Sequence, residues 1–375
     1  MEYKRLGDIA TYVNGYPFKP EDRGLTGLPI IRIQDLTGNS YDLGFYNGNY
    51  PERIEINDGD VLISWSASLG VYIWNKGKAL LNQHIFKVAF DKCEVNKQFF
   101  VYAVQYKLQE MGAKAHGATM KHIVKKDFDN TAIPFPALEE QEKIAQTMNR
   151  ISRIISDCQQ QLQKLDELVK ARFVEMFGDP VTNPHGFEKV TLSNLAEIKI
   201  GPFGSLLHKE DYIEGGHALV NPSHIIDGKV SVDEKLTVSD DKFAELSAYH
   251  LQVGDVVMGR RGEMGRCAVV LDDGLLCGTG SLLIRTKGEV TADYIQKIIS
   301  FPSFKKTIED MAVGQTMPNL NVPIVSGFQI IKPPMEVQSA YYKFVEQLDK
   351  SKVVVQKALD EAQTLFDSLM QEYFG

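Results

Sequence analysis

Two stretches of the chain, residues 139–177 and 336–374, contain no glycine or proline and carry apolar residues at heptad spacing. In the first stretch the apolar positions are separated alternately by four and three residues, and they are Ile144, Met148, Ile151, Ile155, Cys158, Leu162, Leu165 and Val169. An offset of 197 carries this series onto Tyr341, Val345, Leu348, Lys352, Val355, Leu359, Ala362 and Phe366. Residues in this rhythm lie along one face of an α-helix, so the pattern predicts two long helices.

The strict alternation of spacings favours packing of one helix against the other, as in a coiled coil. The alternative is that each helix packs on its own globular domain. Antiparallel pairing suits two helices of similar length that alternate with globular segments in one chain. A helix of about 38 residues would be ~57 Å long. Lys352 interrupts the apolar seam, which puts uniform pairing along the helices in doubt.

The remaining segments are rich in glycine and in short apolar runs bounded by turn residues, a pattern typical of mixed α/β domains. Short helices are expected near residues 97–111 and 291–311. Strands are expected at residues 60–64, 84–90, 255–258 and 281–286.

An internal repeat relates the two halves of the chain. The string GATM (117–120) recurs as GQTM (314–317) at an offset of 197, and GDV (59–61) recurs at 254–256 at an offset of 195. We therefore expect an α+β protein in which two duplicated globular α/β domains are separated by two long helices that pair as an antiparallel coiled coil. The expected boundaries are a first domain at 1–138, a first spacer helix at 139–177, a linker at 178–186, a second domain at 187–335 and a second spacer helix at 336–375.

Charge alone argues against nucleic acid as a partner, because the 375 residues carry 41 Lys and Arg against 49 Asp and Glu, a net charge of −8. The acidic excess is uneven, however. Residues 1–138 hold 16 basic and 15 acidic residues, whereas residues 178–334 hold 15 and 20. Local basic clusters occur in KAHGATMKHIVKK (114–126) and GRRGEMGR (259–266). Glycine beside arginine lets backbone amides approach a phosphate, and arginine can pair with guanine through two hydrogen bonds. A solvated loop explains any single cluster equally well.

Polar residues of the predicted loops supply further candidates for contacts with DNA. Asparagine and glutamine can pair with adenine in the major groove, whereas Trp65 fits a core position as well as stacking on a base. The candidate DNA-binding residues of both kinds are Ser64, Trp65, Ser66, Asn82, Gln83, His84, Lys114, His116, Thr119, Lys121, Asn221, Ser223, Arg260, Arg261, Arg266, Gln315, Thr316 and Asn319.

Catalytic constellations are missing from the sequence. There is no Gly-x-x-x-x-Gly-Lys-Ser/Thr phosphate loop, no His-Glu-x-x-His, no nucleophile elbow and no Asn/Asp-Pro-Pro-aromatic tetrapeptide. The eight histidines show no metal-ligand spacing. The four cysteines lie far apart, which suits a reduced cytoplasm, and no apolar run reaches the ~20 residues that span a bilayer. We therefore expect that this chain has no catalytic residues, binds no metal and does not associate with a membrane.

The order of these strings resembles the DNA-specificity subunit of type I restriction–modification systems. The resemblance rests on the alternation of globular domain and long helix, twice over, and on local sequences. In the first copy these are LGDIA (6–10), GDVLIS (59–64), NQHIFKV (82–88) and GATMKHI (117–123). In the second copy they are GPFGS (201–205), GDVVMG (254–259) and GQTMPNL (314–320), and Ser205 of GPFGS joins the candidate set.

The resemblance implies a cytoplasmic, non-catalytic subunit that binds double-stranded DNA. Each globular domain would read one half of an interrupted target, and the paired helices would fix the gap and dock two methyltransferase subunits. Those partners would use S-adenosylmethionine to methylate adenine N6, and added restriction/translocase subunits would cleave unmodified DNA with ATP and Mg²⁺. This chain itself would bind no cofactor. Two other functions stay open at this point: a self-contained nuclease or methyltransferase with an unfamiliar active site, and a coiled-coil scaffold that binds only protein.

Overall fold

The computed structural model describes residues 2–39, 42–114, 123–203, 206–312 and 319–375, and it divides into two compact units. Unit 1 comprises Met1–Leu162 with Val354–Gly375, and unit 2 comprises Gln163–Val353. Both divisions fall inside long helices. Each unit therefore contains one globular domain together with a segment of each helix.

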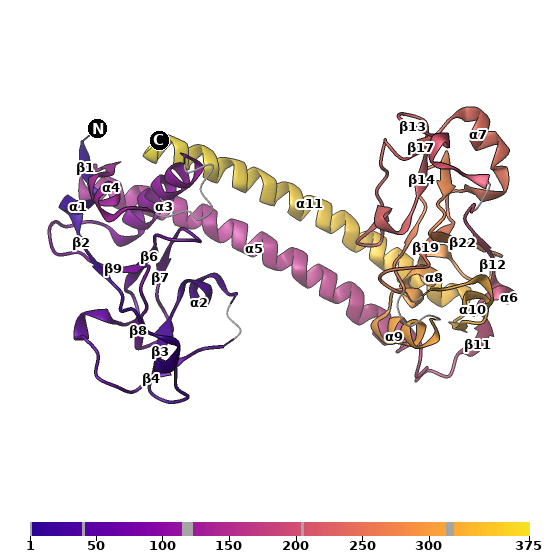
Figure 1. Ribbon diagram of the computed structural model, residues 1–375, viewed down its shortest axis with the longest axis horizontal. Coiled ribbons are helices and arrows are strands. Elements are labelled where there is room, and N and C mark those ends of the chain that lie inside the picture. The colour runs from indigo at the N-terminus through magenta and orange to yellow at the C-terminus, as the bar shows by residue number, and fades with distance from the viewer. Residues whose placement is uncertain (1, 40–41, 115–122, 204–205, 313–318) are drawn as a thin grey trace. The chain divides into compact units, whose positions relative to one another are not determined.

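The two long helices are α5 (Leu138–Phe177) and α11 (Met335–Phe374), of 40 residues each. In unit 1, the beginning of α5 shares a hydrophobic core with the end of α11, where Met148 and Phe374 are both buried. In unit 2, the end of α5 meets the beginning of α11, and the rings of Phe173 and Tyr341 lie 5.6 Å apart. The helices run in opposite directions in both units (Figure 1). This confirms the pairing predicted from the heptad pattern and the antiparallel direction predicted from the alternation of domains and helices.

The heptad positions on both helices are buried or half-buried, and most residues between them are exposed. The half-buried seam positions include Ile155, Leu162, Leu165, Val345, Leu348, Val355, Leu359 and Phe366. Lys352 does not leave a gap in this seam. Its Nζ lies 2.7 Å from Asp166 Oδ1 on the facing helix and 3.4 Å from Asp349 Oδ1 on its own. Burial lowers the pKa of Lys352, but the hydrogen bond and charge of Asp166 outweigh that effect and the net pKa is raised.

The globular domain of unit 1 is built on a four-stranded antiparallel sheet in the order β2-β9-β6-β7. A second sheet, in the order β4-β3-β8-β5, contains one parallel pair, β3 with β8. A short ribbon of β1 with β10 joins the start of the domain to the segment before α5. The strands are β1 (Tyr3–Arg5), β2 (Thr11–Asn14), β3 (Leu28–Ile31), β4 (Phe45–Tyr46), β5 (Glu55–Ile56), β6 (Val61–Ser64), β7 (Gly70–Ile73), β8 (Ala79–Leu81), β9 (Ile85–Ala89) and β10 (Ala132–Pro134). The α-helices are α1 (Leu6–Ile9), α2 (Ile33–Thr37), α3 (Lys97–Lys114) and α4 (Lys125–Asn130).

The globular domain of unit 2 repeats this plan. Its four-stranded antiparallel sheet has the order β12-β22-β19-β20, its second sheet has the order β13-β17-β14-β21-β18, and β14 with β21 is the parallel pair. The ribbon is β11 with β23, and β15 pairs with β16. The strands are β11 (Glu188–Thr191), β12 (Ala196–Ile200), β13 (Tyr212–Ile213), β14 (His217–Val220), β15 (Ile225–Ile226), β16 (Lys229–Val230), β17 (Thr237–Val238), β18 (His250–Leu251), β19 (Val256–Gly259), β20 (Cys267–Val269), β21 (Leu275–Cys277), β22 (Ser281–Thr286) and β23 (Gln329–Lys332). The α-helices are α6 (Leu192–Leu195), α7 (Asp240–Glu245), α8 (Ala292–Ile299), α9 (Pro302–Met311) and α10 (Val322–Ser326).

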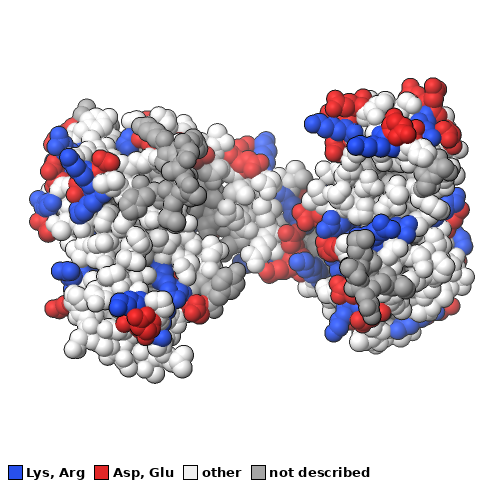
Figure 2. Space-filling model, viewed as in Figure 1, with Lys and Arg blue, Asp and Glu red and all other residues white. Residues whose placement is uncertain are grey.

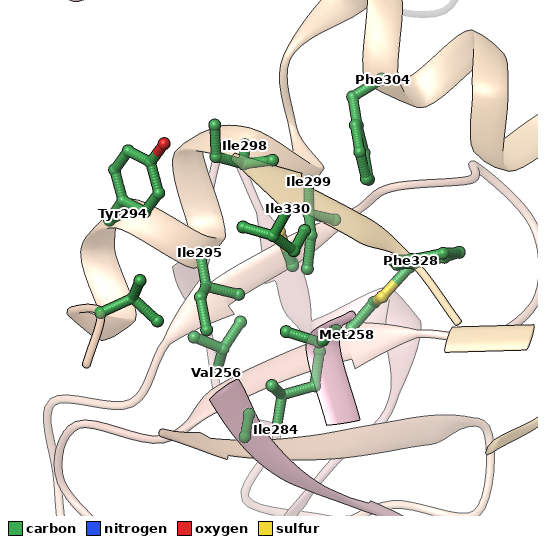
Figure 3. Close-up of a cluster of buried hydrophobic side chains, with 14 of the residues drawn as sticks. Val256, Met258, Ile284, Tyr294, Ile295, Ile298, Ile299, Phe304, Phe328 and Ile330 are labelled. Atoms are coloured by element: carbon green, nitrogen blue, oxygen red, sulfur yellow. The ribbon is translucent and has the colours of Figure 1, made fainter. Parts of the chain in front are cut away.

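One helix of the first domain corresponds to two in the second. The 18-residue α3 is continuous, whereas α8 and α9 are separated at Ser300 and Phe301. Pro302 explains the break, because the residue before a proline is driven out of the helical conformation. Figure 3 shows α8 packed on the sheet, with Ile295 directed toward Val256 of the inner strand β19.

The repeated Gly-Asp-Val string is a turn that leads into one of the two central strands of the four-stranded sheet in each domain, β6 in the first and β19 in the second. Gly59 and Gly254 have φ of +88° and +90°, which favour glycine. The following aspartates accept backbone N–H groups three residues upstream, Asp60 from Asn57 at 2.8 Å and Asp255 from Gln252 at 2.7 Å. The turn therefore fixes where β6 and β19 begin, and so fixes the loops at their far ends.

Candidate nucleic-acid interface

Arg260 follows the central strand β19 directly, and hydrogen bonds on both sides hold its backbone. Its N–H donates to the carbonyl of Gly280 at 3.0 Å, and its carbonyl accepts the N–H of Leu320 at 2.9 Å. The position of its Cα is thus fixed by two segments that are distant in sequence. Such support gives a side chain a defined direction.

The arginines of this loop differ in their partners. The Arg260 Nε donates to Asn319 Oδ1 at 3.0 Å, and among the described residues no carboxylate forms an ion pair with Arg260. Burial, together with the charge of neighbouring Arg261, lowers the pKa of Arg260. Arg266 instead donates from Nη2 to Glu263 Oε2 at 2.8 Å and from Nη1 to the Pro222 carbonyl at 3.2 Å. Arg261 is exposed.

Asn221 and Ser223 flank Pro222 in a short 3₁₀ turn that packs against the same loops. Two glycines make this close approach feasible. A Cβ at Gly278 would lie 2.3 Å from Asn221 Oδ1, and one at Gly280 would lie 2.9 Å from Pro222 Cδ. Asn221 is half-buried and Ser223 is exposed. The structure therefore gathers the described candidates of the second domain into one cluster.

In the first domain, Trp65 occupies the position that Arg260 has in the second, and it makes the equivalent backbone hydrogen bonds. Its N–H donates to the His84 carbonyl at 3.3 Å, and its carbonyl accepts the N–H of Ile123 at 3.0 Å. The indole is half-buried, stacks on Phe86 with centroids 5.5 Å apart, and meets the edge of His84 at 5.0 Å. Packing with the core therefore accounts for this ring.

Two serine candidates at the end of β6 are buried. Ser64 is fully buried, with its hydroxyl donating to the Ser68 carbonyl at 2.5 Å, and Ser66 is only 6% exposed. The Ser64 hydroxyl thus holds the loop after β6, and neither serine faces solvent in this structure, so a contact of either with DNA stays a prediction. Residue type and position after a strand do not reveal that a serine side chain turns inward.

The segment Asn82–His84 carries unusual features for a short connection between strands. Asn82 Oδ1 and His84 Nδ1 are buried and have no hydrogen-bond partner among the described residues. His84 has φ of +72° and Ala67, in the neighbouring loop, has φ of +58°. Unsatisfied buried polar atoms and non-glycine residues at positive φ each cost free energy of folding. They therefore persist mainly at sites where function requires them. Gln83 is half-buried, and its N–H donates to the Tyr16 carbonyl at 2.9 Å.

Tyr16 and the glycine before it belong to this region but were missed in the sequence. A Cβ at Gly15 would lie 2.0 Å from the Asn82 carbonyl oxygen, and a Cβ at Gly201 would lie 2.0 Å from that of Gly278. Both copies thus need glycine at this point, where one backbone segment lies directly against the carbonyl oxygen of another. The exposed aromatic rings of Tyr16 and Phe203 follow shortly after it. The sequence signal for this pair is that Gly15 and Gly201 align in the internal repeat, each a few residues after the matching leucine and alanine of the two copies.

Several candidates fall where the structure gives no description. His116, Thr119, Lys121, Ser205, Gln315 and Thr316 lie outside the described residues, and Lys114 ends α3 without a described side chain. Over the faces visible in Figure 2, basic and acidic side chains are intermixed on both domains. Within the described ranges, no helix is long and apolar enough to cross a bilayer, and no three His, Cys, Asp or Glu side chains are grouped to hold a metal.

Known proteins resemble the chain over almost its whole length. The family model described as "Type I restriction modification DNA specificity domain" matches twice, over residues 1–167 and 184–362, which confirms the duplication. The type I restriction enzyme EcoBI specificity subunit of Escherichia coli is 22% identical, with 98% of this chain and 84% of the relative covered. The MjaVIII specificity subunit of Methanocaldococcus jannaschii is 21% identical, with 93% and 86% covered.

Solved structures agree on the fold. The S subunit of a type I restriction–modification system from M. genitalium matches with a TM-score of 0.58 and 15% identity, covering 100% of this chain and 96% of that one. A chain from a study of complex assembly and conformational transition of the type I R-M system matches with a TM-score of 0.65 and 16% identity, covering 99% and 97%. Two matches to the family model, in a chain built from two copies of one domain and two antiparallel helices, lead to one conclusion: this protein belongs to the family of type I restriction–modification DNA-specificity subunits.

Proposed function

We propose that this chain is the non-catalytic subunit that recognises a bipartite, interrupted sequence in double-stranded DNA, with one half read by each globular domain. The observation that carries the proposal is the repetition of one backbone framework with different side chains. Equivalent backbone hydrogen bonds hold one position in each domain, and that position is Trp65 in the first domain and Arg260 in the second. Equal frameworks with unequal surfaces suit two readers of different half-sites.

The helices α5 and α11 supply the spacing in this proposal. Each has 40 residues, which corresponds to about 60 Å at 1.5 Å per residue. A packed helix pair resists bending, so the number of unspecified base pairs between the half-sites follows from helix length. The same helices offer long exposed faces on which partner subunits can dock.

Catalysis belongs to partner subunits in this proposal. Two methyltransferase subunits bind S-adenosylmethionine and methylate adenine N6, and restriction/translocase subunits use ATP and Mg²⁺ to cleave unmodified DNA. A methyltransferase must extrude its adenine from the duplex, so the recognition domains also hold distorted DNA. The net charge of −8 fits this division, because basic partners then provide much of the phosphate contact.

Reconstitution distinguishes the proposal from its two alternatives. The purified chain, incubated with DNA and either S-adenosylmethionine or Mg²⁺, is expected to be inert. The chain with its methyltransferase partners is expected to methylate adenines in one interrupted sequence. Activity of the chain alone would establish a self-contained enzyme. Absence of any sequence-dependent protection or methylation with the partners present would establish a protein-only scaffold.

Lengthening the helices tests the spacing role. Insertion of matched turns into α5 and α11 is expected to lengthen the unspecified gap while both half-site sequences stay the same, as read from the methylated motif. A changed half-site with an unchanged gap contradicts the spacing role.

A further inference from the structure

We propose that Arg260 is a specificity residue that reads a guanine in the half-site of the second domain, and that Asn319 is its positioning residue. This inference rests on the proposed function and adds to it a base, a residue and a side-chain orientation.

Arg260 is a half-buried cation, and only its Nε has a side-chain hydrogen-bond partner among the described residues. Asn319 Oδ1 accepts from its Nε at 3.0 Å, and among the described residues its terminal nitrogens donate to no acceptor. The other partly buried arginines of this domain are neutralised: Arg266 by Glu263 at 2.8 Å, and Arg285 by Asp255 at 2.7 Å. Partial burial of a guanidinium without a carboxylate costs free energy that an external acceptor can recover.

The hydrogen bond that holds the guanidinium through Nε favours a base over a phosphate. A guanidinium held through Nε keeps its two terminal nitrogens available as a planar fork, which matches the O6 and N7 acceptors of guanine in the major groove. The amide of Asn319 provides that hold without neutralising the charge. Two backbone bonds fix the Arg260 Cα as well. Non-specific phosphate contacts need no such support, and exposed Arg261 beside it suits that role.

The first domain sharpens the inference by contrast. Trp65, which takes the equivalent position, has a ring packed on Phe86 and an N–H that cannot form a two-pronged contact. Reading of guanine from this framework position is therefore confined to one half of the target. A change at Arg260 has a defined place to act, and the other half-site is an internal reference.

The test uses the full chain assembled with its methyltransferase partners and a DNA library randomised across both half-sites, with methylated adenines identified by sequencing. Wild type is expected to prefer guanine at one position of the second half-site. Arg260→Gln is expected to reduce that preference by roughly 5- to 150-fold, the range for one bidentate base contact. Arg260→Lys keeps the charge but loses the fork, and Asn319→Ala removes the hold on Nε. Both are expected to relax the same position and no other.

Arg261→Gln is the matched control, since it changes an exposed arginine of the same loop. It is expected to weaken binding at all sequences and to lower its salt dependence without changing the motif. If Arg260→Gln or Arg260→Lys leaves the guanine preference intact, or relaxes both half-sites equally, Arg260 is not a specificity residue. Failure of the wild-type complex to methylate any interrupted sequence would instead refute the proposed function. Equal thermal unfolding of wild type and Arg260→Lys separates loss of specificity from loss of fold.

Discussion

Phe374, in the last turn of α11, offers a sharp test of how the helix ends are held. Its side chain is fully buried in unit 1, and its ring lies 5.3 Å from that of Phe99. Truncation of a buried phenylalanine to alanine removes its transfer free energy and leaves a cavity, at a cost of about 3–5 kcal/mol. Phe374→Ala should therefore destabilise unit 1 by that amount and release the end of α11 from the first domain.

Tryptophan fluorescence during unfolding in guanidinium is a suitable assay because the chain has two tryptophans, Trp65 and Trp74, and both belong to unit 1. With a denaturant dependence of roughly 4 kcal/mol per M for a unit of this size, a loss of about 4 kcal/mol lowers the midpoint by ~1 M. Phe177→Ala is the matched control. Phe177 is equally buried in unit 2, with Tyr294 at 5.2 Å, and its truncation should leave the fluorescence transition in place.

Two results would refute this reasoning. A fluorescence midpoint that Phe374→Ala leaves unchanged would mean that the end of α11 contributes no stability to the first domain. An equal shift of the fluorescence midpoint in Phe177→Ala would mean that the two units unfold as one. The effect of each helix end would then not be confined to its own domain. Far-UV circular dichroism, which reports on both units, should record a transition shift in each variant.

Three further outcomes follow from groups buried in unit 2. Lys352→Met should raise the guanidinium midpoint of the unit, since it restores an apolar seam and leaves Asp166, which is 61% exposed, solvated; a lowered midpoint would show that the ion pair is net stabilising. Burial raises the pKa of the Cys267 and Cys277 thiols to about 12, so at pH 8 a thiol reagent should modify them only as fast as the unit unfolds; rapid modification in the native state would contradict their burial. Burial raises the pKa of Tyr341 to about 12, above the value of about 10 in unfolded chains. The contribution of the protonated tyrosine to the free energy of unfolding is therefore complete below about pH 10 and is lost as the pH rises through about 12. Tyr341→Phe should therefore make the loss of stability between those pH values less steep, as followed by circular dichroism.

The helices and the duplication could be predicted because they depend on patterns that persist along the sequence. A 3-4 alternation of apolar residues determines which helix face is buried, and local strings in the same order twice reveal a repeat. The antiparallel pairing followed from connectivity. The partner of Lys352 did not, because an ion pair to Asp166 depends on the register between two distant helices.

The candidate site was predictable by location but not by side-chain role. Polar residues in the loops after β6 and β19 were singled out from the sequence, and their role as DNA contacts stays a prediction. Whether each side chain turns inward, as Ser64 does, depends on contacts that local sequence does not encode. The hydrogen bond between Arg260 and Asn319 joins residues 59 positions apart, and only the folded sheet brings them together. Pro302 was the one visible signal that the second copy divides a helix that the first keeps whole.

The proposed function requires each globular domain to read one half of a bipartite DNA target. A map of N6-methyladenine in cells that produce this chain with its methyltransferase partners tests it most directly, when compared with cells in which residues 187–335 are replaced by the corresponding domain of another family member. We expect an interrupted motif in the first case, and in the second the same motif with one half replaced and the other half retained. Loss of both halves, or a motif that the exchange leaves unchanged, would contradict it.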